Sequence, residues 1–267
     1  MRFLKKIHLR LLYILGRRKW GAARICTICK NKINFFLPYR NGIKGVPPLI
    51  QELKIVGSDV DNYLCPSCGS HDRERHLILY MKSFSFFLEL QEKKILHIAP
   101  EPHISKFIKS LKPLEYIGGD LAPQNPETQR VNIEKTEFPD SYFDIVIANH
   151  VLEHVDNEDK ALKELFRITK AGGYAILQTP FSSKLTVTFS DVGIDTPKAR
   201  LHAYGQEDHV RIFGLDIEKK ISSAGFISHL STHKELLPHI NAKMYGVNEI
   251  EPFFLFEKSI NGFDARQ

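Results

Sequence analysis

Several patterns are missing from this 267-residue chain, and their absence narrows the choice of protein classes. No apolar run approaches the roughly 20 residues that a membrane-spanning helix needs, so we expect no such helix. The first twenty residues contain a short apolar core, LLYIL, followed by Arg-Arg-Lys without a small-residue cleavage site, so no secretory signal peptide is expected. An organellar transit peptide stays open as an alternative, because this segment is basic, amphipathic and free of acids.

Acidic residues are absent from the first fifth of the chain. Residues 1–51 contain twelve Lys or Arg and no Asp or Glu, whereas the rest carries 25 basic and 31 acidic residues. A basic N-terminal arm, residues 1–24, on a mildly acidic body favours contact with a polyanion such as nucleic acid, anionic lipid headgroups or a phosphorylated carrier. A solvated terminus without a partner is the alternative.

Cysteine occurs only four times, in two pairs with the same spacing. The pairs are Cys26-x-x-Cys29 and Cys65-x-x-Cys68. Two such pairs supply the four thiolates of a tetrahedral structural Zn²⁺ site, which leaves no open position for catalysis. We therefore predict a small zinc-ribbon-like module over residues 25–75. Disulfides, or pairs that never meet, are the alternatives that the spacing leaves open.

Helical and strand patterns alternate after the cysteine pairs. Apolar residues at helical spacing predict a helix from Leu77 through Leu90. Beyond it, strands are predicted over KKILHIA, EYIGGDL, YFDIVIAN, YAILQTPF and EPFFLFEKS, and helices over HISKFIKSL, DNEDKALKELFRIT and the segment ending at EKKISSAGF. We expect the pair Gly172-Gly173 to close the second of these helices. The pattern is typical of an α/β domain with a mostly parallel sheet covered by helices on both faces.

Polar residues at the ends of the predicted strands form a candidate binding site. In a parallel α/β sheet, ligands bind beyond the carboxyl ends of the strands, where the strand order reverses. Asp120 ends the second strand nineteen residues after Glu101, a position suited to accepting hydrogen bonds from a ribose diol. The other candidates at strand ends are His97, Pro100, Asn132, Ile133, Asn149, His150 and His154.

The sequence ILHIAPEP…YIGGDLAP…FPDSYFDIVIANHVLEHV…ALKELFRITKAGGYAIL resembles the class I S-adenosylmethionine-dependent methyltransferases, over roughly residues 93–258. The resemblance implies a Rossmann-like domain with a mostly parallel seven-stranded sheet, and S-adenosyl-L-methionine as cofactor. We place this domain at residues 76–267, with a substrate loop at 181–215. The paired cysteines, FLPY, CPSCGSHDRERH and GQEDHVRIFG also resemble a bacterial subgroup whose members are often encoded among surface-glycan or secondary-metabolite genes.

Matched position by position, the resemblance assigns roles to the strand-end residues. Asp120 would bind the ribose, and Asn132 and Ile133 would lie near the adenine. Asn149 and His150 would line the methionine end of the cofactor and the entrance for the substrate.

The turn after the first strand departs from the family pattern. His97 replaces the usual strand acid, and the run Ala99-Pro100-Glu101-Pro102 replaces the glycine loop. Pro102 is tolerated in a first helical turn. The helix N-terminus favours the methionine carboxylate, and Glu101 or the carbonyls around it would receive the ammonium group. A degenerate turn that binds nothing is the alternative.

Two histidines are candidates for a general base. Methyl transfer from a sulfonium chiefly needs an aligned nucleophile, and a hydroxyl acceptor also benefits from a base near neutral pH. His209 and His150 could serve, with Asp208 and Arg211 as candidate substrate contacts. A loop-packing histidine is the alternative for His209. His154 shares a face with His150 if the helix has begun, and we expect it to anchor that helix to a backbone carbonyl.

These observations predict a methyltransferase in the cytoplasm, or peripheral to the membrane, that methylates a hydroxyl of a sugar, nucleotide-sugar or other small metabolite. One alternative is an RNA methyltransferase that grips phosphates with the zinc module and the basic arm. The other is a zinc-stabilised binding protein whose methyltransferase-like domain is inactive.

Overall fold

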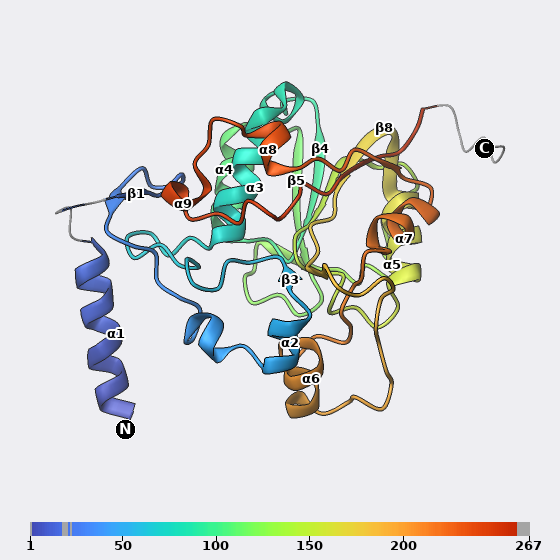
Figure 1. Ribbon diagram of the computed structural model, residues 1–267. Helices are drawn as coiled ribbons and strands as arrows, with labels where there is room; N and C mark the ends of the chain where they lie inside the picture. Colours follow the sequence, from blue (N-terminus) through green and yellow to red (C-terminus); the bar gives the residue numbers. More distant parts are fainter. Residues whose placement is uncertain (1, 18–20, 22, 261–267) are drawn as a thin grey trace. The chain divides into compact units, whose positions relative to one another are not determined.

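The computed structural model describes residues 2–17, 21 and 23–260 (Figure 1). The chain forms two compact units. The cysteine unit comprises Met1–Val46, Gly57–Phe84 and Thr232–Glu251. The sheet unit comprises Pro47–Val56, Ser85–Ser231 and Pro252–Gln267.

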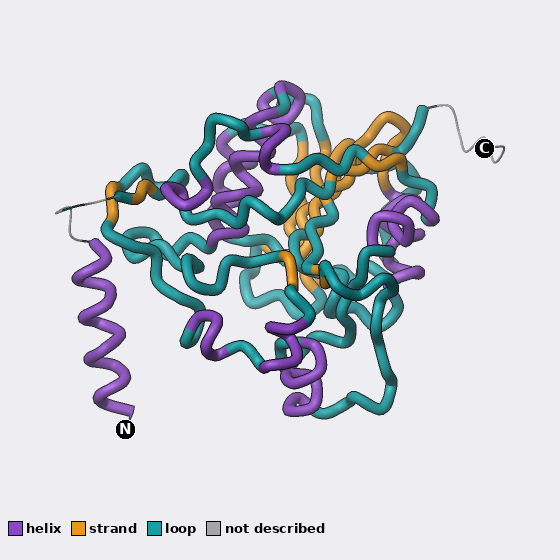
Figure 2. The backbone as a smooth tube through the Cα atoms, in the orientation of Figure 1, coloured by secondary structure: helices purple, strands orange, loops and turns teal. Residues whose placement is uncertain are grey.

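The sheet unit is built on a seven-stranded sheet with the strand order β10-β11-β8-β7-β4-β5-β6, drawn in orange in Figure 2. Its strands are β4 (Lys94–Ile98), β5 (Glu115–Asp120), β6 (Thr128–Arg130), β7 (Phe143–Ala148), β8 (Thr169–Ile176), β10 (Ile227–Ser228) and β11 (Leu255–Glu257). From β6 to β8 neighbouring strands run parallel, and β11 is antiparallel to β8 and to β10.

The strand order identifies the fold. The chain starts in the middle of the sheet at β4, moves outward through β5 and β6, and returns to the other side of β4 with β7 and β8. This is the order of a Rossmann-like sheet with an antiparallel strand added near one edge. The prediction of a Rossmann-like fold with a mostly parallel seven-stranded sheet is confirmed. The order reverses between β4 and β7, which places the expected ligand crevice at the carboxyl ends of these two strands.

Helices cover the sheet with apolar stripes. The helix α5 (Glu158–Ile168) is capped by Asn157, whose side chain accepts a hydrogen bond from the backbone N–H of Lys160. Its buried residues, Ala161, Leu162, Leu165 and Ile168, follow helical spacing and join the core. Figure 1 shows α5 beside α7 (Ile217–Ser223), and Lys220 Nζ lies 3.0 Å from Glu158 Oε1 to join them. The helix after β4 is α4 (Pro102–Ser110).

The predicted substrate loop, residues 181–215, has regular structure of its own. It contains β9 (Phe181–Ser182), which pairs with β3 (Ile55–Val56), and α6 (Pro197–Tyr204). Gly205 ends α6 with a φ of 91° and packs against Ile50 of α2 (Pro48–Glu52).

Two predicted element boundaries are wrong. The helix α5 ends at Ile168 and Thr169 begins β8 directly, so Gly172 and Gly173 lie inside the strand. A Cβ on Gly173 would lie 2.9 Å from the carbonyl oxygen of Asp144, so this glycine serves a close approach of two strands rather than a helix end.

The other wrong boundary is the helix predicted through Leu90. The helix α3 (Asp72–Ser83) ends at Phe84, which is extended, and a 3₁₀ turn at Ser85–Leu88 follows. Phe87 in that turn is fully buried. The spacing of apolar residues in a short 3₁₀ turn can thus resemble that of a continuing α-helix.

The cysteine unit is organised around a buried arginine. Its elements are α1 (Arg2–Arg17), β1 (Arg24–Ile25), β2 (Lys32–Ile33), a 3₁₀ turn at Gly42–Gly45, α3, α8 (His233–Leu236) and α9 (Ala242–Tyr245). Arg75 on α3 is fully buried, and its guanidinium donates to the carbonyls of Asn62, Tyr63, Ser70, Tyr245 and Gly246. Because these carbonyls come from distant segments, α3 and residues 232–251 group with the cysteines, and the two units do not follow the predicted boundaries at residues 24 and 75.

The predicted basic arm contains the helix α1, and residues 1, 18–20 and 22 of the arm lie outside the described part of the chain. Arg17 Nε donates to the carbonyl of Pro66 at 2.6 Å, so the end of α1 is tied to the loop of the second cysteine pair. Leu11 and Ile14 are more than half exposed. Among the described residues, no helix combines the length and the hydropathy that crossing a bilayer requires.

We expect Gly119→Ala to destabilise the sheet unit by about 1–3 kcal/mol, because a new methyl group must be forced into a packed core. A Cβ at position 119 would lie 2.9 Å from Val131 Cγ2 and 3.1 Å from Ile98 Cδ1. Urea unfolding measures the change. Gly193→Ala is the control: its Cβ would meet only the end of the Asp191 side chain, so a change within about 0.5 kcal/mol is expected. Equal losses in both variants would contradict this account.

Candidate functional site

Two strand ends at the reversal of the sheet order carry unusual backbone geometry. Ala99, directly after β4, has a φ of 47°, and His150, just after β7, has a φ of 55°. Side chains other than glycine rarely adopt these left-handed conformations. The Ala99 N–H donates to the carbonyl of Gly119 at 2.7 Å, which holds the glycine-free turn against β5. Backbone strain at two neighbouring strand ends is a feature that clusters at functional sites.

The carboxylate of Glu101 links these two strand ends. Its Oε2 lies 3.0 Å from Nε2 of His97 on β4, and its Oε1 accepts a 2.6 Å hydrogen bond from Nδ2 of Asn149 after β7. Nδ1 of His97 lies 2.9 Å from the hydroxyl of Tyr116. His97, Glu101 and Asn149 are all buried. A buried carboxylate with these partners is fixed in position and can attract a cation at the reversal point.

Asp120 lies at the end of the neighbouring strand. It is the last residue of β5, is half-buried, and its Oδ1 accepts from the backbone N–H of Ala122 at 2.8 Å. Pro100 packs on the same strand, since a Cβ on Gly118 would lie 3.1 Å from Pro100 Cγ. Pro102 is the first residue of α4, as expected for a proline in a first helical turn.

The predicted adenine residues follow the next strand along the sheet. Asn132 comes two residues after β6 and its Oδ1 accepts from the backbone N–H of Glu134, while Ile133 is buried. The predicted cofactor residues therefore sit at the carboxyl ends of four adjacent strands, β6, β5, β4 and β7. Their contacts with a ligand stay predictions.

The predicted bases gather in the turn after β7 and the segment that packs on it. His150 Nδ1 lies 3.5 Å from Glu153 Oε1, and the rings of His154 and His209 meet edge to face with centroids 4.7 Å apart. The helix α5 begins only at Glu158, so His150 and His154 lie in a turn and not on one helical face. His154 Nδ1 faces Asp208 Oδ2 at 3.3 Å, a side-chain carboxylate rather than the backbone carbonyl that we expected.

Glu153 is the residue of this cluster that the sequence interpretation missed. It is only 2% exposed, and burial alone would raise the pKa of its carboxyl. A hydrogen bond from His150 and the nearby charges of His150, His209 and His154 outweigh that effect and lower the pKa to about 2. Burial lowers the pKa of His209, whose Nδ1 lies 3.2 Å from the carbonyl of Tyr204. The only sequence signal for Glu153 is its place between two candidate histidines.

The predicted substrate contacts Asp208 and Arg211 are placed very differently. The Asp208 side chain is exposed. Arg211 is buried, and its guanidinium donates to the carbonyls of Leu152, Val155 and Asp156 and pairs with Glu158 at 3.1 Å. The structure therefore assigns Arg211 a bracing role in the turn after β7, and its contact with a substrate stays a prediction.

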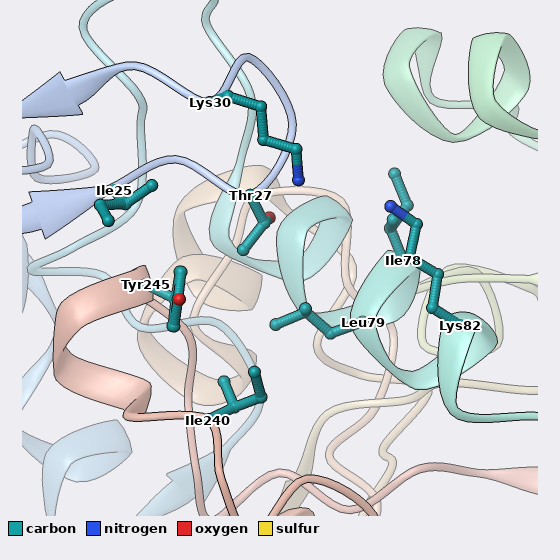
Figure 3. Close-up of a pocket in the computed structure, with 8 residues that line it drawn as sticks. All are labelled: Ile25, Thr27, Lys30, Ile78, Leu79, Lys82, Ile240 and Tyr245. Carbon is teal, nitrogen blue, oxygen red and sulfur yellow. The ribbon is translucent and has the colours of Figure 1, made fainter.

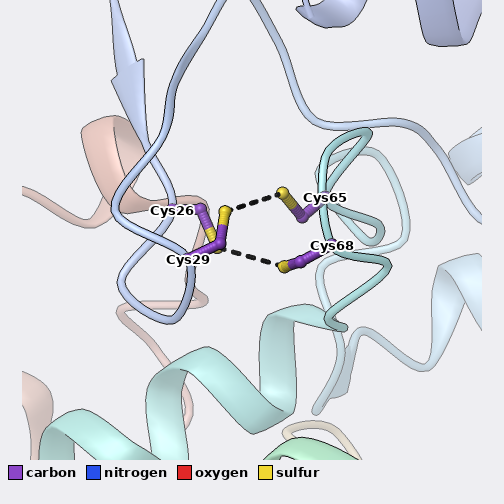
Figure 4. Close-up of side chains that lie close together, drawn as sticks. All are labelled: Cys26, Cys29, Cys65 and Cys68. Carbon is purple, nitrogen blue, oxygen red and sulfur yellow. Dashed lines mark hydrogen bonds between the residues drawn. The ribbon is translucent and has the colours of Figure 1, made fainter.

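The four cysteines converge in the cysteine unit (Figure 4). Cys26 Sγ lies 3.8 Å from Cys68 Sγ, and Cys29 Sγ lies 3.9 Å from Cys65 Sγ. All four are free thiols. Sulfurs around one tetrahedral Zn²⁺ with Zn–S bonds of 2.3 Å are about 3.8 Å apart, so the donor set and its spacing fit zinc.

The two cysteine loops repeat one backbone conformation. The N–H of Lys30 donates to the carbonyl of Cys26, and the N–H of Gly69 donates to the carbonyl of Cys65, each at 2.9 Å. Both Lys30 and Gly69 have left-handed φ values, 61° and 77°. Two separate segments thus present a thiol pair in the same way, which disulfides or unrelated pairs would not require.

The thiol pKa values diverge within this cluster. Hydrogen bonds with Cys65 and Cys68 lower the pKa of Cys26, whereas hydrogen bonds with Cys26 and Cys68 raise the pKa of Cys65. Burial raises the pKa of Cys29 to about 11. Four thiolates this close repel one another, and a divalent cation removes that repulsion.

The cysteine unit also contains a cavity of about 230 Å³, lined by eight residues (Figure 3). Two of them are lysines, Lys30 from the first cysteine loop and Lys82 from α3; the others are Ile25, Thr27, Ile78, Leu79, Ile240 and Tyr245. The cavity contains none of the predicted cofactor residues.

Comparisons with known proteins found a family model and curated relatives that are similar to part of this chain. A family model described as a methyltransferase domain matches residues 87–177. The ubiquinone/menaquinone biosynthesis C-methyltransferase UbiE of Vibrio campbellii is 38% identical over 63 residues, which are 24% of this chain and 24% of that protein. UbiE of Vibrio cholerae is 40% identical over 68 residues, 23% of this chain and 26% of that protein. The matches therefore span about a quarter of the length of these curated relatives.

A solved structure of an S-adenosylmethionine-dependent methyltransferase from Mesorhizobium loti is similar to 69% of this chain and 96% of that chain, with 14% sequence identity and a TM-score of 0.47. The assignment of the fold to this chain rests on its strand order.

We expect Arg211→Lys to reduce the free energy of unfolding by about 3–5 kcal/mol, since a lysine cannot reach three carbonyls and a carboxylate at once. Urea unfolding measures the loss. Arg200→Lys is a suitable control because Arg200, half-buried in the same unit, donates through Nε to a single carbonyl, that of Ile194. If Arg211→Lys left stability unchanged, the bracing role would be wrong.

Proposed function

We propose that this chain, whose residues 87–177 match a family model described as a methyltransferase domain, is a class I S-adenosylmethionine-dependent methyltransferase that transfers a methyl group from S-adenosyl-L-methionine to a small acceptor. One observation carries the proposal. Two carboxylates, Glu101 and Asp120, lie at the carboxyl ends of the adjacent strands β4 and β5, next to the reversal of the strand order between β4 and β7.

Different strand-end residues bind different parts of the cofactor. Asp120 accepts hydrogen bonds from the ribose hydroxyls, and Glu101, fixed by His97 and Asn149, receives the ammonium group. The N-terminus of α4, which starts at Pro102, favours the carboxylate of the methionine part. Ala99 and Pro100 form the turn beneath it.

The remaining cofactor contacts come from the neighbouring strand ends. Asn132 and Ile133 flank the adenine, and Asn149 and His150 face the methionine end. The cofactor supplies an already activated methyl group, so the protein mainly has to position the acceptor.

We place the acceptor hydroxyl near His150. The carboxylate of Glu153 lies 3.5 Å from His150 Nδ1, and His150 is the proposed base that takes the proton as the oxygen attacks. His209 is the second candidate base. A sugar, nucleotide-sugar or other small metabolite is the proposed acceptor class. The alternative acceptor is a carbon atom, as in the name of the C-methyltransferase UbiE. Analysis of the methylated product would distinguish an oxygen acceptor from a carbon acceptor.

We expect Asp120→Asn and Glu101→Gln each to weaken binding of S-adenosyl-L-methionine by about 10- to 100-fold, the value of one hydrogen bond to a charged group. Titration calorimetry on the full chain measures the affinity. Asp191→Asn is a matched control, because Asp191 accepts from the N–H of Gly193 just as Asp120 accepts from that of Ala122. Equal weakening by the control, or no binding to the unmodified protein at millimolar cofactor, would overturn the proposal.

The proposed metal of the cysteine unit is one structural Zn²⁺ held by Cys26, Cys29, Cys65 and Cys68. The sulfur spacing and the repeated loop conformation support it. With four thiolates bound, no position remains for chemistry, so the ion would act on folding alone.

Metal analysis should find one zinc per chain. Cys29→Ser should release it and expose the cysteine unit to proteolysis, because zinc binding and folding are coupled. Ser67→Ala should keep the zinc, since Ser67 contributes only its backbone N–H to Cys65 Sγ. A chain that folds equally well and binds no zinc would contradict the assignment.

We also propose that the protein is cytoplasmic and that its basic arm contacts an anionic membrane surface or another polyanion. Exposed Leu11 and Ile14 on α1, in a segment rich in Lys and Arg, support it. RNA is the less favoured polyanion, because the basic arm by itself has low specificity.

A further inference from the structure

Glu153, His154 and His209 converge in the sheet unit. One potential ligand atom from each, a carboxylate oxygen and two imidazole nitrogens, lies within 4.8 Å of the other two. Glu153 and His154 come from the turn after β7, and His209 comes from the segment after α6. The donors come from two chain segments, so the fold itself brings them together.

Two atoms of this cluster are buried and have no hydrogen-bond partner among the described residues. They are Oε2 of Glu153 and Nε2 of His209, on side chains that are 2% and 7% exposed. Leaving a buried polar atom without a partner is unfavourable, and more so for a charged group. Two such atoms in one cluster indicate that something else occupies the site.

The other nitrogen of each histidine is already held. Nδ1 of His209 lies 3.2 Å from the carbonyl oxygen of Tyr204, an acceptor that requires Nδ1 to carry the proton. The lone pair of His209 is therefore on Nε2. Nδ1 of His154 lies 3.3 Å from Oδ2 of Asp208, while its Nε2 lies 4.0 Å from Oε1 of Glu153. A carbonyl or carboxylate on the remote nitrogen is the usual support of a metal-bound histidine.

We propose that Glu153, His154 and His209 bind a divalent first-row metal ion of the zinc type, separate from the cysteine cluster. Two imidazoles and one carboxylate are the protein ligands of many catalytic zinc sites and leave at least one position open. Ligand atoms of a tetrahedral site stand about 3.3 Å apart, so the donors need to move inward by no more than about 1.5 Å.

The site has a consequence for the acceptor. Oε1 of Glu153 holds His150, whose neighbour Asn149 belongs to the proposed cofactor crevice, so the metal would lie close to the entrance for the substrate. A hydroxyl on the open position would lose its proton more readily, as metal-bound water does. This role rests on the proposed methyl transfer, whereas metal binding itself does not.

Co²⁺ is the probe for the experiment. The full chain is first loaded with zinc and then dialysed against a chelator that strips sites weaker than the thiolate cluster. Cobalt bound to imidazole and carboxylate gives visible ligand-field bands, and cobalt bound to thiolates adds sulfur-to-metal charge transfer in the near ultraviolet. We expect one equivalent of Co²⁺ with ligand-field bands and no charge transfer.

Variants locate the ion. Glu153→Gln, His154→Gln and His209→Gln should each weaken Co²⁺ binding by at least about 100-fold, since losing a ligand costs more than losing its support. His154 is partly exposed, so its variant keeps the test valid if the other two fold poorly. His229→Gln is the matched control, because His229 also faces a carboxylate, Glu257 Oε2 at 2.8 Å, in the same unit.

Two results would overturn the metal site. One is that the zinc-loaded, chelator-treated chain binds no Co²⁺ at millimolar concentration. The other is that the folded His154→Gln variant binds Co²⁺ as tightly as the unmodified chain. Binding of S-adenosyl-L-methionine to the stripped protein is titrated in parallel. If that cofactor fails to bind while Co²⁺ binds as expected, the proposed function fails and the metal site stands.

Discussion

The buried carboxylate of Glu101 is the constraint around which the candidate cofactor crevice is arranged. An unpaired charge in this position would be strongly unfavourable. The fold therefore supplies two partners: His97 on β4, and Asn149 directly after β7, the neighbouring parallel strand. Ala99 lies in the turn that carries Glu101, and His150 lies in the turn that carries its partner Asn149; both have left-handed conformations.

A second buried acid, Glu153, repeats this arrangement one turn further along the chain. Its partners are histidines rather than an amide, and Arg211 holds the surrounding turn by three backbone carbonyls. The turn after β7 is therefore a rigid polar structure in which side chains are positioned by other buried polar groups. Such an interior suits chemistry that depends on fixed geometry, and it contrasts with the exposed position of Asp208.

The sequence predicted what depends on local pattern. Four strands of the parallel sheet (β4, β5, β7 and β8), the place of Asp120 at a strand end and the two cysteine pairs followed from apolar runs and from spacing within a few residues. The strand β6 has no apolar residue and gave no such signal. What it could not predict depends on partners far along the chain. The bracing role of Arg211 could not be predicted, because its three carbonyl acceptors lie more than fifty positions earlier. Gly172 and Gly173 looked like a helix end, because the close approach of Asp144 that requires Gly173 is a tertiary contact. The only local signal for Glu153 was its place between two candidate histidines.

The contacts of Arg75 determine when the core of the cysteine unit can be completed during synthesis. Two of the carbonyls around its guanidinium, those of Tyr245 and Gly246, belong to a segment that is synthesised about 170 residues later. Until that segment has left the ribosome, a buried cation would face an incomplete shell of acceptors. The core of the cysteine unit therefore cannot be completed until residues 85–231, most of the sheet unit, have been synthesised.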